Sequence, residues 1–338
     1  MPDLSLPQPY LLFLGDTTES GYAKTAFGLR DWAPERCVGE FSCPGATVST
    51  GLPFLTPAEA YAAGARAMVI GVANAGGFIP PTWTDAFVEA MEAGLDLVGG
   101  MHARLRNIPA VREHAARLGR RLIDVREPPL QLPVASGRPR TGRRLLTIGT
   151  DCALGKKYTA LAIARAFKAR GVDATFRATG QTGILIAGAG IPLDAVVADF
   201  AAGAAEMLTP DADPKHWDVI EGQGSLHHPA YAGVSLSLLH GSQPDVVVVC
   251  HEPGREHVLG HPDFAVPSVR ETIAVALRLG SRTSPHIRCA GVSLNTGKLD
   301  ADEAARLIES ESDRLGLPVA DPMRGGSAFE ELVDACLA

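Results

Sequence analysis

The chain has 338 residues, a net charge of −7, 46% hydrophobic residues and 20% charged residues. This composition supports a large core, excludes wholesale disorder, and argues against non-specific nucleic-acid binding. No run of 18 apolar residues marks a membrane span. Residues 1–5 lack the basic start and apolar core of a secretion signal. Six widely spaced cysteines fit reduced thiols better than a disulfide framework. We therefore expect a cytoplasmic protein with no nucleic-acid or membrane partner.

The first part of the chain alternates apolar runs with helix-like segments. Buried strands are predicted at residues 10–14, 37–41, 67–72, 95–99 and 122–125. Helices are predicted between them, at residues 17–29, 57–63, 81–93 and 109–118. This alternation predicts a parallel sheet covered on both faces. Lys24 and Asn74 follow the first and third strands, where they can complete a cleft or have a purely structural role.

Residues 127–143 interrupt this alternation with several prolines, glycines and arginines. Such a composition is typical of an inter-domain linker, so we expect domains at residues 1–126 and 144–338. Arginines 138, 140, 143 and 144 are interpreted as a solvated linker face, and a role facing a phosphate is the alternative.

The second part alternates in the same way. Strands are predicted at residues 145–148, 174–178, 218–221, 245–250, 287–294 and 317–319. Helices are predicted at residues 155–170, 194–208, 266–279 and 301–315. The predicted fold class is therefore α/β, with two parallel-sheet domains, and ligands in such sheets bind beyond the carboxyl ends of the strands. Two apolar segments, 234–239 and 273–277, fit either a core or the subunit interface of a homo-oligomer.

A glycine-bracketed loop follows the first strand of the second part and leads into a helix. Such a loop surrounds phosphate oxygens with backbone N–H groups, and a lysine adds positive charge. Five residues separate its glycines where the common pattern has four, and Lys157 stands where a Ser or Thr usually binds Mg²⁺. The loop therefore predicts phosphate binding more strongly than ATP hydrolysis. The predicted cofactor-binding residues are Gly149, Thr150, Asp151, Cys152, Ala153, Leu154, Gly155, Lys156 and Lys157.

Two residues of this loop, Asp151 and Cys152, fit more than one role. Asp151 can hold the loop through backbone hydrogen bonds, orient Lys156 or contact a substrate amine. Cys152 fits a nucleophile, because a helix N-terminus lowers the pKa of a thiol. We expect it to be a small loop residue instead, since the local sequence indicates no partner histidine.

A second polar segment follows the predicted strand at 218–221. Glu221 ends the strand, and the glycines around Gln223 allow backbone to approach a ligand closely. A carboxylate at this place can bind Mg²⁺, act as a general base or simply cap a turn. His227 and His228 come next, and either one can titrate near neutral pH or lie satisfied near the surface.

Further polar residues follow two other strands. Arg177, Gln181 and Thr182 are predicted on a glycine-flanked loop, which suits a carboxylate or phosphate or forms a mere polar turn. His251, Glu252 and Arg255 follow the strand at 245–250. We predict these six residues as substrate-binding. No metal site is predicted, because the nearby histidines 257 and 261 match no metal-binding spacing.

The motifs carry two family resemblances. The loop and the segment Val219-Ile-Glu-Gly-Gln-Gly are similar to those of dethiobiotin synthetase-type P-loop enzymes, although Lys157 departs from them. Nearly the whole chain resembles the DgcN-like family, on the segments Gly149–Ala153, 178–185, Glu221–Leu226, 239–245 and 250–255. That family more often has Gly-Lys-Met-Thr-Thr where this chain has Gly155-Lys-Lys-Tyr-Thr159.

The DgcN-like resemblance implies a Rossmann-like first half, a P-loop second half and an amino-acid N-acetyltransferase of D-amino acid catabolism. We expect transfer of an acetyl group from acetyl-CoA to the amine of D-glutamate. The loop would hold the pyrophosphate of coenzyme A, and Arg177 or Arg255 would bind a substrate carboxylate. Glu221 or Asp151 would act as the base, and backbone N–H groups or Gln223 would steady the oxyanion.

Two other functions remain open on these residues. One is an ATP-dependent ligase or kinase of the dethiobiotin synthetase type, which would use ATP and Mg²⁺. The other is a nucleotide-binding regulatory protein, which would bind without turnover.

Overall fold

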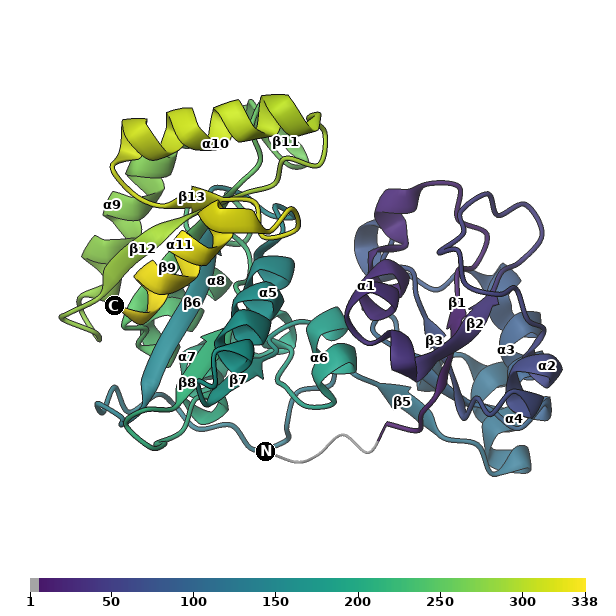
Figure 1. Ribbon diagram of the computed structural model, residues 1–338. Helices are drawn as coiled ribbons and strands as arrows, with labels where there is room; N and C mark the ends of the chain where they lie inside the picture. Colours follow the sequence, from purple (N-terminus) through teal and green to yellow (C-terminus); the bar gives the residue numbers. More distant parts are fainter. Residues whose placement is uncertain (1–5) are drawn as a thin grey trace. The chain divides into compact units, whose positions relative to one another are not determined.

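The computed structural model describes residues 6–338, so the segment 1–5, where no secretion signal is expected, lies outside the described residues. The chain divides into two compact units (Figure 1). The N-terminal unit comprises the described residues up to Pro128 together with Gln181–Pro192. The C-terminal unit comprises Pro129–Gly180 and Leu193–Ala338. Each unit contains its own parallel sheet, which confirms the predicted fold class.

The sheet of the N-terminal unit has the strand order β2-β1-β3-β4-β5. Apolar residues line its strands because helices cover both faces. Its strands are β1 (Tyr10–Phe13), β2 (Cys37–Phe41), β3 (Ala67–Ile70), β4 (Asp96–Gly99) and β5 (Leu122–Asp124). Its helices are α1 (Lys24–Trp32), α2 (Pro57–Ala62), α3 (Thr84–Glu92) and α4 (Pro109–Leu118).

The helix predicted from residue 17 begins only at Lys24. Ser20 and Gly21 belong to a 3-10 turn, since both residue types favour turns over helix interiors. Short 3-10 turns occur at η1 (Ser20–Tyr22), η2 (Pro34–Arg36), η3 (Ala75–Gly77), η4 (Pro81–Trp83), η5 (Leu105–Asn107) and, in the other unit, η6 (Leu193–Ala195).

The sheet of the C-terminal unit has the order β13-β12-β9-β6-β8-β7. Helices α5 and α11 pack on one face, and α8 and α9 on the other, with α7 against α8 (Figure 1). Its strands are β6 (Arg143–Gly149), β7 (Ala174–Arg177), β8 (Trp217–Ile220), β9 (Val246–His251), β12 (Arg288–Leu294) and β13 (Val319–Ala320). Its helices are α5 (Lys156–Ala169), α7 (Ala198–Leu208), α8 (Ala232–Ser242), α9 (Val269–Gly280), α10 (Ala301–Leu315) and α11 (Gly326–Leu337).

Two helices and a two-stranded hairpin of this unit were not predicted. Helix α8 contains the apolar segment 234–239, and its Leu238 and Leu239 are buried in the core. Helix α11 ends the chain. The antiparallel hairpin β10 (His257–Val258) and β11 (His261–Ala265) extends from the polar segment after β9.

The arginines after Pro128 do not all form a solvated face, which corrects the sequence interpretation. The guanidinium of Arg140 donates to the carbonyl oxygens of Glu206, Thr209 and Gly241, at 2.6–2.7 Å. It therefore satisfies the last carbonyls of α7 and α8, and burial lowers its pKa to about 10. Arg144 is buried and donates to the carbonyl of Arg140 at 2.8 Å. The arginines hold this segment onto the C-terminal unit.

Helix α6 (Gln181–Ala187) stands where a loop was predicted, and it belongs to the N-terminal unit. The hydroxyls of Thr25 and Thr182 are 2.9 Å apart. The guanidinium of Arg36 donates to the carbonyl of Ile186 at 2.9 Å. The N-terminal unit is thus completed by a segment that lies, in sequence, within the second half of the chain.

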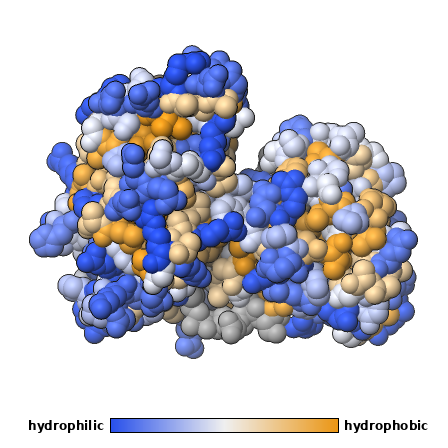
Figure 2. Space-filling model, in the orientation of Figure 1, coloured by the Kyte–Doolittle hydropathy of each residue, from blue (hydrophilic) through white to orange (hydrophobic). Residues whose placement is uncertain are grey.

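Within residues 6–338, no helix has the length and apolar character needed to cross a membrane. In the view of Figure 2, α10 at the top of the C-terminal unit is covered by hydrophilic residues. This agrees with the burial of its side chains, since only Ala304 and Leu315 of α10 are buried.

Candidate active site

The glycine-bracketed loop connects β6 to α5 in the C-terminal unit. Gly155 has a φ of 102°, a left-handed conformation that favours glycine, and it directly precedes the helix. Lys156 is the first residue of α5, and its side chain is buried. Its ammonium donates to the carbonyl of Asp151 at 2.7 Å, and burial lowers its pKa. The Lys156 side chain thus links the start of α5 to the backbone of the loop.

Asp151 holds the loop from a fully buried position. One carboxylate oxygen accepts from the guanidinium of Arg255 at 2.9 Å and from the backbone N–H of Leu259 at 2.8 Å. The other accepts from the N–H of Cys152 at 2.6 Å. Arg255 also donates to the carbonyl of Cys152 at 2.8 Å. Of the three predicted roles for Asp151, this geometry corresponds to holding the loop, with its charge compensated by Arg255.

The end of β9 supplies the neighbouring polar residues. The ring nitrogen Nδ1 of His251 lies 2.9 Å from the hydroxyl of Thr150, and burial lowers the pKa of His251. Glu252 pairs with Arg255 and, at 2.6 Å, with Lys298. Burial alone would raise the pKa of Glu252, but the hydrogen bonds from these two cations lower it. Thr150, Asp151, His251, Glu252 and Arg255 therefore form one connected cluster.

Glu221 lies directly after β8, beside the turn that follows β7. One of its carboxylate oxygens accepts from the backbone N–H groups of Thr179 and Gly180, at 3.0 and 3.1 Å. The side chain is 4% exposed. Burial raises the pKa of Glu221, although Lys157 and the two hydrogen bonds oppose that shift. The side-chain amide of Gln223 donates to the hydroxyl of Thr179 at 3.0 Å.

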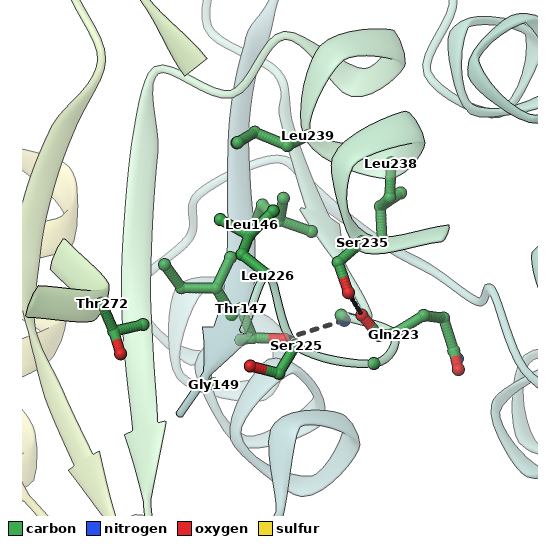
Figure 3. Close-up of a pocket in the computed structure, with 13 residues that line it drawn as sticks. Leu146, Thr147, Gly149, Gln223, Ser225, Leu226, Ser235, Leu238, Leu239 and Thr272 are labelled. Carbon is green, nitrogen blue, oxygen red and sulfur yellow. Dashed lines mark hydrogen bonds between the residues drawn. The ribbon is translucent and has the colours of Figure 1, made fainter. Parts of the chain in front are cut away.

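The glycines around Gln223 allow very close backbone packing. A Cβ on Gly222 would lie 1.7 Å from the carbonyl oxygen of Thr147 and 3.0 Å from Cδ of Lys156. The N–H of Gly222 donates to the hydroxyl of Thr147 at 3.0 Å, and Ser235 donates to the carbonyl of Gln223 at 2.7 Å (Figure 3). These contacts fix the segment 222–226 against β6. The cavity beneath it, about 10 Å³, has room for about one water molecule.

His228 brings a third group to the loop. Asp151, Cys152 and His228 place an oxygen, a sulfur and a nitrogen atom within 4.8 Å of one another. His228 is 1% exposed, and its Nε2 lies 4.0 Å from Asp151. Such ligand types can hold a metal ion. However, Asp151 already faces the guanidinium of Arg255, so a cation there would meet a like charge. The donor set fits loop support better than metal binding.

Comparison with known families agrees with both units. Residues 41–128 match "Domain of unknown function (DUF1611_N) Rossmann-like domain", and residues 133–333 match "Domain of unknown function (DUF1611_C) P-loop domain". The chain belongs to the DUF1611 family. The expected Rossmann-like and P-loop halves are thereby confirmed.

Three related proteins match nearly the whole chain. A "D-glutamate N-acetyltransferase" from Tritonibacter scottomollicae is 51% identical over 98% of both chains. A protein of the same name from a Pseudoalteromonas species is 45% identical over 96% of this chain and 97% of its own. The crystal structure of a DUF1611 family protein from Anabaena variabilis is 34% identical, with a TM-score of 0.86 over 98% of this chain and 99% of its own. These matches confirm the DgcN-like resemblance.

Three predicted site residues of this DUF1611 protein are not members of the loop cluster. The guanidinium of Arg177 donates to the buried carboxylate of Asp218 at 2.6 Å, so it is engaged within the sheet. Gln181 and Thr182 belong to the N-terminal unit. Thr159, which corresponds to the last Thr of the family's Gly-Lys-Met-Thr-Thr segment, lies in α5, is buried, and has its hydroxyl 2.8 Å from that of Ser293.

Some contributors to the site were missed from sequence. The hydroxyl of Thr147 accepts from the N–H of Gly222, and the N–H of Leu259 donates to Asp151. The hydroxyl of Thr179, which accepts from Gln223, lies in the glycine-flanked segment that the sequence marks as polar. The contribution of Leu259 is a backbone group in a hairpin, for which the sequence offers no marker.

Proposed function

We propose that this protein transfers the acetyl group of acetyl-CoA to the amine of D-glutamate. The observation that carries the proposal is the 51% and 45% identity, over nearly full length, to two proteins named D-glutamate N-acetyltransferase. The geometry of the C-terminal unit supports it, because the unit offers both an anion cradle and a buried carboxylate.

The loop before α5 suits the pyrophosphate of coenzyme A. Helix α5 has 14 residues, no side-chain cap and no acidic residue in its first turn, so the partial positive charge at its N-terminus favours an anion. The ammonium of Lys156 adds a desolvated positive charge. Asp151 does not repel the phosphates, since Arg255 compensates its charge. The negative charge of the phosphates would also offset the cost of burying the Lys156 ammonium.

Glu221 is the proposed general base. The ammonium of the substrate must lose a proton before its nitrogen can attack the thioester carbonyl. The raised pKa of Glu221 makes its carboxylate a stronger base than an exposed glutamate. The C–S bond then breaks, coenzyme A leaves as a thiolate that takes up a proton, and an amide remains. Gln223 keeps one side-chain N–H beyond its bond to Thr179, and this donor would steady the oxyanion.

Arg255 is proposed as a positioning residue. Its guanidinium contacts Asp151, Glu252 and the carbonyl of Cys152. These contacts commit it to holding the loop, and they reduce what it can offer to a substrate carboxylate. Arg177 is similarly engaged by Asp218. The substrate carboxylates therefore require other cations.

We also place the protein in the cytoplasm. All six cysteines are free thiols in the structure, and reduced thiols are typical of that compartment.

The proposal is tested by incubating the purified protein with acetyl-CoA and either glutamate enantiomer. Mass spectrometry should detect N-acetylglutamate from D-glutamate and coenzyme A in equal amounts. Calorimetry with acetyl-CoA and with Mg-ATP is the companion measurement. Tight Mg-ATP binding without acetyl-CoA binding, or no product from D-glutamate, would contradict the transferase assignment.

A further inference from the structure

The N-terminal unit contains a separate polar cavity of about 110 Å³. We call it the Lys24 pocket, and its chemically important lining residues are Lys24, Asn74, His102, Arg126 and Gln181. All of them belong to the N-terminal unit. The cavity is about ten times larger than the one beneath Gly222, so it can hold several non-hydrogen atoms of a ligand.

The position of this pocket in the sheet is where parallel α/β folds bind ligands. The strand order β2-β1-β3-β4-β5 reverses its direction between β1 and β3. Ligands bind beyond the carboxyl ends of the strands at such a switch point. Asn74 follows β3, His102 follows β4, and Lys24 begins α1, the first α-helix after β1. The topology therefore brings these three side chains to the expected place.

The charges of the pocket select an anion. Lys24 and Arg126 are cations, and no carboxylate lines the cavity among the residues that the structure describes. Lys24 is exposed and has no ion-pair partner within residues 6–338. Arg126 lies 3.2 Å from Nδ1 of His102. Because a guanidinium only donates, Nδ1 accepts, and the neutral ring carries its proton on Nε2 as a further donor.

Two side-chain amide oxygens of residues that line the pocket favour a ligand that also carries a hydrogen-bond donor. Oδ1 of Asn74 and Oε1 of Gln181 are buried, and the structure shows no hydrogen-bond partner for either one. Buried polar atoms are normally paired, so these two unpaired oxygens, on residues that line one cavity, indicate that a ligand or water completes them. An ammonium group offers three N–H donors to such oxygens.

The walls of the pocket are built for close packing. A Cβ on Gly77 would lie 2.3 Å from the ring of His102, and a Cβ on Gly100 would lie 2.9 Å from Cβ of Gln181. Gly77 also has a positive φ of 57°. These glycines let His102 and Gln181 approach the backbone closely, so packing fixes the positions of these two lining residues.

We propose that the Lys24 pocket binds the acidic amino-acid substrate. Lys24 and Arg126 bind its carboxylates, and the amide oxygens of Asn74 and Gln181 accept from its ammonium. This inference rests on the proposed function, since it takes D-glutamate as the substrate. It also explains why Arg177 and Arg255 are engaged elsewhere, and it assigns amino-acid recognition to the N-terminal unit.

The test is calorimetric titration of the full-length protein with D-glutamate. Lys24→Met and Arg126→Met should each weaken D-glutamate binding at least tenfold and leave acetyl-CoA binding unchanged. The matched controls are Lys168→Met and Arg117→Met, which alter exposed cations outside the pocket and should bind D-glutamate like the parent protein. Glutarate lacks the ammonium and D-norvaline lacks the side-chain carboxylate, so both should bind more weakly than D-glutamate.

The outcomes separate this inference from the proposed function. Unchanged D-glutamate affinity in both Lys24→Met and Arg126→Met would overturn the pocket assignment, even if acetyl transfer is observed. Equal binding of D-glutamate and D-norvaline would also overturn it. Loss of D-glutamate binding in both variants, with no acetyl transfer by the parent protein, would support the pocket and refute the transferase. Melting temperatures of the variants confirm folding, and Lys24 is exposed, so its replacement leaves the core intact.

Discussion

Lys24 and Lys156 occupy matching places in the two units but have opposite surroundings. Each begins the first α-helix after the first strand of its sheet. Lys156 is 7% exposed and donates to a loop carbonyl, whereas Lys24 is exposed beside an open polar cavity. A desolvated, fixed ammonium interacts strongly with a multiply charged phosphate. An exposed ammonium suits a small carboxylate that must bind and leave. We therefore propose that the same residue type, at the same topological place, binds a different kind of anion in each unit.

The strongest way to break this comparison is to disturb the backbone that supports Lys156. Gly222→Ala should lower the free energy of unfolding by about 3 kcal/mol or more, because its Cβ would overlap the carbonyl of Thr147. Gly233→Ala in α8 is the control, since a Cβ there meets no atom within 4 Å. It should be neutral or stabilising by up to about 1 kcal/mol. Denaturant unfolding measures both, and equal stability of the two variants would contradict the packing argument.

Glu221→Gln tests whether Glu221 is the general base. Removal of the base should lower kcat about 100-fold or more. Because burial raises the pKa of Glu221, activity should fall on acidification at a higher pH than an ordinary glutamate would give. A raised folded-state pKa also means that stability is lost as the pH rises through it, so the neutral glutamine should not lower the melting temperature.

Rates measured from pH 4 to pH 9 and thermal melting check this prediction. Glu331→Gln, on the exposed side of α11, is the matched control and should retain full activity. A Glu221→Gln enzyme with parental kcat would rule out Glu221 as the base.

Lys156→Met sharpens the comparison of the two lysines directly. It should weaken acetyl-CoA binding about 10- to 100-fold, since a hydrogen bond to a charged group contributes about 1.5–3 kcal/mol. D-Glutamate affinity should stay unchanged, which is the reverse of the pattern expected for Lys24→Met. Calorimetry with each ligand measures both effects. If one variant weakens both ligands equally, the two lysines do not serve separate anions.

The smallest expected effect concerns His251, which lies against the loop. Burial lowers its pKa, so the unfolded chain takes up a proton at a higher pH than the folded protein. Stability should therefore fall as the pH drops below about 6.5. His251→Gln should reduce the loss between pH 7.5 and 5.5 by up to about 1 kcal/mol. Urea unfolding at both pH values measures it, with the exposed His286→Gln as a control that should behave like the parent protein.

Much of the fold follows from the sequence because buried parallel strands are short apolar runs. The strand at Cys37–Phe41 and the helices at Pro109–Leu118 and Ala301–Leu315 have their predicted bounds. Helix α8 was missed because it is apolar on all sides and lacks the periodicity that reveals a surface helix. The hairpin after β9 was missed because its strands are short and exposed.

The site was predictable in its parts but not in its pairings. The loop, Glu221 and the end of β9 are all marked by polar residues after apolar runs. The sequence cannot show that Arg255 turns toward Asp151, or that Arg177 reaches Asp218, because both pairings join distant residues. It also could not show that Gln181 starts a helix of the other unit, since Gly180 and Gly183 flank a segment that reads as a turn.

Helix α6 has a consequence for how this protein can be divided and recombined. A cut after Pro128 yields an N-terminal fragment without α6, so the buried Thr25 loses its partner Thr182 and Arg36 loses the carbonyl of Ile186. The remaining fragment would carry Ile184 and Leu185, fully buried in the intact chain, with no surface to cover them. Neither half is a contiguous, self-sufficient module, so gene fragments, chimaeras and crystallisation fragments should keep the two units on one uninterrupted chain.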